Sequence, residues 1–267
     1  MVLKLPESPS PSSKALLLPL PPRPVSLQSL LQPKAKFKPP LEQRYTLASR
    51  LCSTLSELYS SSWLHKGIRS ENIIFGVHTV PPVPGAAQTD AILRSMLLCG
   101  FDYSRQESEW STIDKSKLSG DVATAIYRHP SYQGEAAQGY KIQYDIYSLG
   151  LILVEIALWV PLSTFLDGKP SSSNAKSSTK DTSMRLSLDM EVFYAPHAAL
   201  LKNRVLNRVD NELAFRVGSA YYNAVKFCLE FADKKAISDA SDFPSHPALE
   251  FYDNVVTPLA KLVGVSQ

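Results

Sequence analysis

The stretch WLHKGIRSENIIF, residues 63–75, decides how the rest of the sequence is interpreted. It places His65 seven residues before Asn72, in a polar loop that ends in three apolar residues, for which we predict a short strand. The segment before it, residues 41–64, has leucines at 47, 51, 55 and 58, which is helical spacing with charged and serine residues on the other face. We therefore expect a loop that joins an amphipathic helix to a strand.

Three more segments follow in order. LLCGFDYSR (97–105) is predicted to be a strand that leads into a turn. YRHPSY (127–132) lies within a mostly polar stretch, 104–143, for which we predict a long loop. DIYSLGLILVEI (145–156) is apolar nearly all round, which predicts a helix buried on every side at the centre of a domain.

Together, these four segments resemble the C-terminal lobe of a protein kinase. HKGIRSEN is similar to the catalytic loop H-R-D-x-x-x-x-N, the triplet GFD stands where kinases have D-F-G, and YRHPSY stands where they have A-P-E. The resemblance covers roughly residues 25–240 and is closest to the kinase-like C-terminal domains of fungal heterokaryon-incompatibility and prion-associated proteins. It implies a mainly α fold (α+β overall), a kinase-like C-lobe with a few short strands.

The catalytic residues that the resemblance implies are not intact. Gly67 stands at the catalytic aspartate, Gly100 at the magnesium-binding aspartate and Arg69 at the phosphate-contacting lysine. Asn72, the second metal ligand, remains, but a hard cation between phosphates needs charged oxygens. The loop His65, Gly67, Arg69, Asn72 is therefore predicted to be degenerate, with His65 as a core histidine.

Asp102 is the one acid near this site that allows an alternative. Positions two apart in an extended chain face the same side, so Asp102 could reach a metal in place of Gly100. The favoured interpretation is a capping or turn aspartate. Asn72 and Asp102 are thus the doubtful cofactor-binding residues, and no confident metal ligand is predicted.

The scaffold residues of a kinase lobe are better preserved. The resemblance implies that Asp145 accepts hydrogen bonds from the loop backbone, and that Phe101, Arg128 and Pro130 are structural. Ser131 stands where kinases have a glutamate that pairs with a late arginine. The matching segment, CLEFADKK (228–235), has no arginine, so we expect both halves of that ion pair to be absent.

Composition places limits on the class of protein. The net charge is +3, of which residues 1–44 carry +5, so the folded part has no positive excess and is not expected to bind nucleic acid. Three widely spaced cysteines at 52, 99 and 228 indicate free thiols. Without a visible signal peptide or an apolar run long enough to span a membrane, we expect a soluble, cytoplasmic protein.

Half of the 20 prolines lie in the first 40 residues. We therefore predict a Pro/Ser/Lys-rich disordered or hinge-like segment at 1–39, and a C-lobe at 40–267 with a disordered insert at 166–184.

Two functions remain open at this stage. The first is a pseudokinase that binds a protein partner or regulates another domain in signalling, with no cofactor, because the acids are replaced and no G-x-G-x-x-G or strand lysine precedes residue 45. The second is an unorthodox Ser/Thr kinase that uses ATP and Mg, with Asp102 on the metal and an N-lobe encoded upstream.

Overall fold

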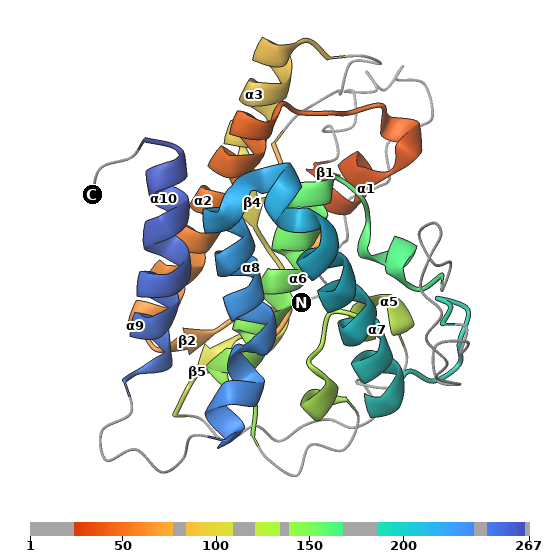
Figure 1. Ribbon diagram of the computed structural model, residues 1–267, viewed down its shortest axis with the longest axis vertical. Coiled ribbons are helices and arrows are strands. Elements are labelled where there is room, and N and C mark those ends of the chain that lie inside the picture. The colour runs from red at the N-terminus through yellow and green to blue at the C-terminus, as the bar shows by residue number, and fades with distance from the viewer. Residues whose placement is uncertain are drawn as a thin grey trace, which may run out of the picture.

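The computed structural model describes residues 24–76, 84–108, 121–133, 139–167, 186–237 and 245–264. In these ranges the fold is mainly helical with a few short strands, as the sequence predicts (Figure 1). The long helices are α2 (Leu41–Ser60), α6 (Ile142–Leu158), α7 (Ala195–Arg208) and α8 (Ala214–Ile237). The shorter ones are α1 (Leu27–Leu31), α3 (Ala86–Arg94), α5 (Val122–Ala125), α9 (Pro247–Phe251) and α10 (Thr257–Leu262).

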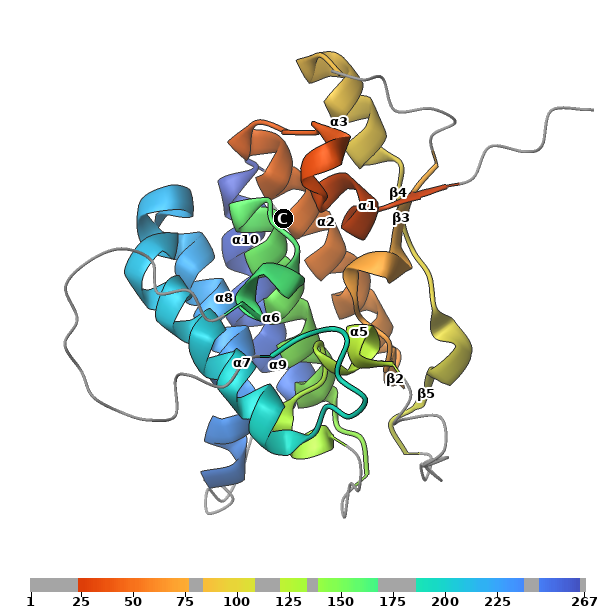
Figure 2. The same cartoon turned by 90° about the vertical axis from the view of Figure 1, so that its right-hand side faces the viewer.

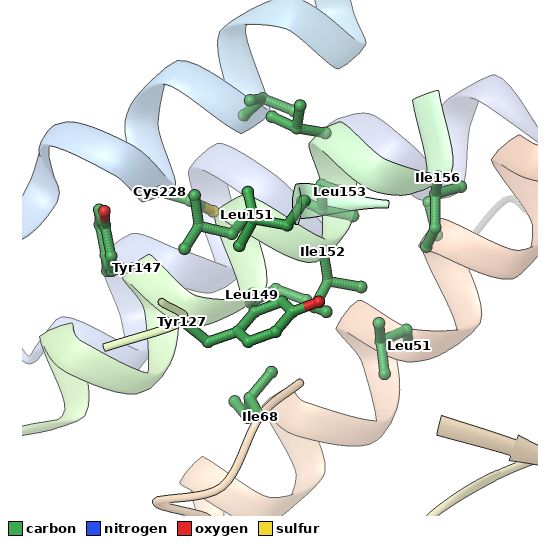
Figure 3. Close-up of a cluster of buried hydrophobic side chains, with 14 of the residues drawn as sticks. Leu51, Ile68, Tyr127, Tyr147, Leu149, Leu151, Ile152, Leu153, Ile156 and Cys228 are labelled. Atoms are coloured by element: carbon green, nitrogen blue, oxygen red, sulfur yellow. The ribbon is translucent and has the colours of Figure 1, made fainter. Parts of the chain in front are cut away.

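Helix α6 forms the centre of the domain. All but two of its residues are buried, which confirms the expectation of a helix that is covered on every side. Leu51 of α2 and Cys228 of α8 lie on opposite sides of it in the core (Figure 3). The helix ends at Leu158, because Trp159 adopts a left-handed conformation, before Pro161 is reached.

The remaining helices enclose α6. Leu47, Leu51 and Leu55 of α2 are buried, as their spacing predicts. Helix α7 continues through a π-helical turn, Val209–Leu213, and the chain then reverses at Gly218 (φ +73°), so that α8 runs back alongside α7 (Figure 2). A second π-helical turn, Tyr252–Val256, joins α9 to α10.

Two small antiparallel sheets flank the loop that contains His65 and Asn72. One has the strand order β1 (Val25–Ser26), β3 (Ile73–Phe75), β4 (Met96–Leu98), and the other pairs β2 (Trp63–Leu64) with β5 (Arg105–Gln106). The loop between β2 and β3 is therefore fixed at both ends by strand pairing.

The ordered domain begins earlier than the predicted boundary at residue 40. Residues 25–39 form β1, α1 and a 3₁₀ turn, and Leu27, Leu30, Leu31 and Phe37 are buried. The Trp159 indole donates to the carbonyl of Phe37 at 2.6 Å. The leucines at 27, 30 and 31 follow an i, i+3, i+4 pattern, and their burial supplies the free energy that orders this segment. Residues 1–23 lie outside the described ranges.

Two other boundaries differ from the prediction. Helix α3 covers residues for which no helix was predicted, and β4 (Met96–Leu98) includes only the start of the strand predicted within 97–105. The polar stretch 104–143 contains β5, α5 and the 3₁₀ turn Pro130–Tyr132 instead of forming one long loop. Of the predicted insert at 166–184, all but the first two residues lie outside the described ranges.

Gly150 allows α8 to pack closely against α6. A Cβ atom there would lie 2.8 Å from Cβ of Cys228 and 3.1 Å from Cδ2 of Leu229. We expect Gly150→Ala to lower the free energy of unfolding by about 2 kcal/mol, because overpacking outweighs the better helix propensity of alanine. Urea denaturation measures this. Gly85→Ala is the control, since a Cβ at Gly85 meets nothing within 4 Å. Equal stability of the two variants would contradict the prediction.

Candidate functional site: a loop without acids

The candidate site is the loop from β2 to Asn72, together with the turn that follows β4. His65 is fully buried, and its ring lies 4.5 Å from the ring of Phe101, centroid to centroid. Its Nδ1 accepts a hydrogen bond from the Gly67 amide at 3.2 Å. Burial lowers the pKa of His65 to about 4, although the nearby Cys99 carbonyl favours the proton. A neutral ring with Nδ1 as acceptor is a core histidine that shapes the loop.

The carboxylate of Asp145 binds the backbone of this loop. Its Oδ2 accepts from the His65 amide at 2.7 Å, and its Oδ1 accepts from the Lys66 amide at 2.9 Å and from the Tyr140 hydroxyl at 2.6 Å. The hydrogen bonds that the resemblance implied for Asp145 are therefore present. Burial raises the pKa of Asp145 to about 6, and these three donors oppose the rise.

Gly67, Asn72 and Gly100, the positions singled out in the sequence, lie close together. The amide Nδ2 of Asn72 donates to the Gly67 carbonyl at 2.7 Å. A Cβ on Gly100, whose φ is +84°, would lie 2.2 Å from that same Nδ2. A Cβ on Gly67 would lie 3.1 Å from the Gly100 carbonyl. The side chain of Asn72 thus takes the place of any side chain at position 100.

Asp102 lies beside this cluster, in the short 3₁₀ turn Phe101–Tyr103, and is exposed. Among the described residues, no group of three or more His, Cys, Asp or Glu side chains could hold a metal ion. The structure therefore brings Asp102 near Gly100 but does not gather a set of ligands around it within these ranges.

The side chain of Arg69 contacts Thr124 of α5 and Glu71. Its Nη1 donates to Oγ1 of Thr124, and its Nε lies 3.3 Å from Oε2 of Glu71. Thr124 in turn donates to Asp121 at 2.6 Å. The guanidinium thus ties the loop to α5, and this explains why a planar, multidentate arginine suits the position.

A series of buried, hydrogen-bonded polar side chains, which the sequence analysis missed, connects the loop to α6. Ser70 Oγ is 2.8 Å from the Tyr127 hydroxyl, which donates to Oε1 of Glu155 at 2.9 Å. The Leu162 amide donates to the same oxygen at 2.6 Å. Oε2 of Glu155 is buried without a hydrogen-bond partner, and burial raises the pKa of Glu155 to about 8. The only signal in the sequence was a glutamate inside an apolar run.

A second cluster that the sequence analysis missed joins Asp233, Lys202 and His129. Asp233 of α8 accepts from Nζ of Lys202 at 2.6 Å and lies 3.2 Å from Nε2 of His129. His129 Nδ1 accepts from the Ser131 amide, so Nε2 carries the proton of the neutral ring and points it at Asp233. Burial, with Lys202 nearby, lowers the pKa of His129 to about 4. A carboxylate on α8 therefore anchors the segment at 129.

The three other predicted structural residues differ in environment. Phe101 packs on His65 but remains 46% exposed. Arg128 is partly buried, and burial lowers its pKa. Pro130 begins the 3₁₀ turn Pro130–Tyr132, where its fixed φ fits the first helical position.

Comparison with known proteins gives one family. The model of a domain of unknown function, DUF7580, matches residues 5–265, and the chain therefore belongs to this family. No curated protein matches the chain. None of the helices in the described ranges combines the length and the apolar character needed to cross a bilayer.

Proposed function

We propose that this member of the DUF7580 family is a catalytically inactive, protein-kinase-like module that binds a protein partner in signalling. The kinase resemblance rests on the order of the four sequence segments. The main observation in favour of inactivity is that the Asn72 side-chain amide occupies the space that a side chain at position 100 would need.

Phosphoryl transfer needs an acceptor for the substrate proton and charged oxygens that hold magnesium against the phosphates. Gly67 has no side chain that could accept the proton. A Cβ added to Gly67 would lie 3.1 Å from the Gly100 carbonyl oxygen. The Asn72 side chain, which donates to the Gly67 carbonyl, occupies the space next to Gly67. The loop is held in shape by Asp145, which supports a role in architecture and binding rather than in chemistry.

Thermal denaturation with and without Mg-ATP tests this proposal. We expect a shift in Tm of less than about 1 °C at 1 mM Mg-ATP, because a ligand that does not bind the native state cannot stabilise it. An active protein kinase measured alongside is the control for the assay. A clear, ATP-dependent rise in Tm would overturn the absence of nucleotide binding.

The alternative function, an unorthodox kinase, makes a different prediction in the same assay. The exposed carboxylate of Asp102 beside Gly100 is the one observation that favours it. Under this alternative, Mg-ATP would raise Tm and Asp102→Asn would abolish the rise. A shift that persists in Asp102→Asn would exclude Asp102 as the metal ligand.

A further inference from the structure

Glu155, near the end of the central helix α6, joins separate segments of the chain through one buried carboxyl group. Its Oε1 accepts from the Tyr127 hydroxyl at 2.9 Å and from the Leu162 amide at 2.6 Å. The Tyr127 hydroxyl in turn lies 2.8 Å from Oγ of Ser70, in the 3₁₀ turn Ser70–Asn72 of the candidate site. Glu155 is therefore connected to the candidate site through a single intervening hydroxyl group.

This carboxyl group has no positive partner within the described ranges. Glu155 is fully buried, and its Oε2 has no hydrogen-bond partner. No lysine, arginine or histidine of the described residues, on α2, α8 or any other element, pairs with it. The titratable groups that face it are Tyr127 and, next to Tyr127, Glu71, and neither supplies positive charge. Burial raises the pKa of Glu155 to about 8, so the charged form appears just above neutral pH.

Ser70 is the group best placed to respond to this charge. Its hydroxyl contacts Tyr127, and it also favours the charged form of Glu155, because it opposes the rise in the pKa of that carboxyl. Burial raises the pKa of Tyr127, so this hydroxyl stays protonated, and the Leu162 amide is fixed in the backbone. A serine hydroxyl turns by rotation about single bonds, so it can donate to Oε2 when that oxygen becomes charged.

We propose that Glu155 is a proton switch: when its carboxyl ionises, the Ser70 hydroxyl turns from Tyr127 to Oε2, and the turn Ser70–Asn72 shifts with it. The O–H bond of the carboxyl is the one covalent bond that breaks, and its proton passes to solvent. The turn carries Asn72, whose side-chain amide lies at the centre of the candidate site. The inference goes beyond the proposed function, because it concerns the shape of the loop and holds whether the loop binds a protein or a nucleotide.

An NMR titration of the amide groups between about pH 6 and pH 10 tests the switch. All samples carry Cys99→Ser, because the Cys99 amide donates to the Asn72 carbonyl and an ionisable thiol there would add its own response. In this protein, the backbone amide of Leu162 and the side-chain amide of Asn72 should shift with one common midpoint near pH 8. Both shifts should disappear when Glu155→Gln is added, since glutamine stays neutral.

Ser70→Ala separates movement of the loop from the electric field of the carboxylate. The Leu162 amide should still titrate in this variant, which also shows that the core is folded, whereas the Asn72 side-chain amide should lose most of its shift. Ser61→Ala, an exposed serine outside the candidate site, is the matched control and should titrate like its parent. An Asn72 shift that survives in Ser70→Ala or in Glu155→Gln would overturn the proposal. A Leu162 amide that does not titrate in the parent would also overturn it, because the carboxyl would then stay neutral.

Discussion

Replacing Asp145 with alanine is expected to lower the free energy of unfolding by about 3 kcal/mol at pH 7.5. The change leaves three donors without their acceptor: the buried His65 amide and Tyr140 hydroxyl, and the partly buried Lys66 amide. The loop that bears Gly67 and Asn72 would lose its attachment to α6. Urea denaturation measures the stability, and amide exchange at residues 65 and 66 measures the local loss of order.

The isosteric variant sharpens this prediction. Asp145→Asn keeps the shape but turns one acceptor oxygen into an NH₂ group, which then faces an N–H of His65 or Lys66. It should therefore be nearly as unstable as the alanine variant. Tyr140→Phe removes one donor and should cost only about 1 kcal/mol. Asp102→Asn, at an exposed position, is the control and should stay within about 0.5 kcal/mol of the wild type. An asparagine variant at position 145 with wild-type stability would contradict the role given to the carboxylate.

The parts of the fold that depend on local periodicity were predictable from the sequence. The leucine spacing of α2, the apolar character of α6 and the polar loop that ends at Asn72 each follow from a pattern within about 20 residues. Asp145 was assigned to the loop backbone only through the kinase resemblance, because the contact joins residues 80 apart. The early boundary at Val25 was missed because proline content was given more weight than three leucines with helical spacing.

The polar clusters could not be predicted, because they join side chains from three different elements. Lys202 and Asp233 lie on α7 and α8, and His129 lies before the 3₁₀ turn at Pro130. The segment CLEFADKK has no arginine, and nothing in its sequence indicates that Asp233 would contact Lys202 and His129. Sequence comparison alone tests residue identity at a position, whereas the structure shows that Asp233 contacts both Lys202 and His129.

Glu155→Gln is expected to stabilise the protein by about 3 kcal/mol at pH 7. The carboxyl group has a pKa of about 8 in the folded protein and an ordinary value of 4.5 when exposed, so it must take up a proton on folding at neutral pH. Glutamine already has the neutral form. Its Oε1 can accept from Tyr127 and Leu162 as the glutamate oxygen does. Thermal and urea denaturation between pH 4.5 and pH 8 measure the difference.

The direction of the pH dependence distinguishes this mechanism from a general gain in packing. Because the folded pKa of Glu155 is raised, its favourable contribution is complete below about pH 4.5 and is lost as the pH rises toward 8. The wild type should therefore lose about 1.4 kcal/mol per pH unit relative to Glu155→Gln within this window, and the two proteins should converge near pH 4.5. Glu57→Gln, on the exposed face of α2, is the control and should show no such divergence. A constant advantage of Glu155→Gln at every pH would mean that the glutamate is not the group that titrates, and that the gain comes from packing around Tyr127 and Leu162.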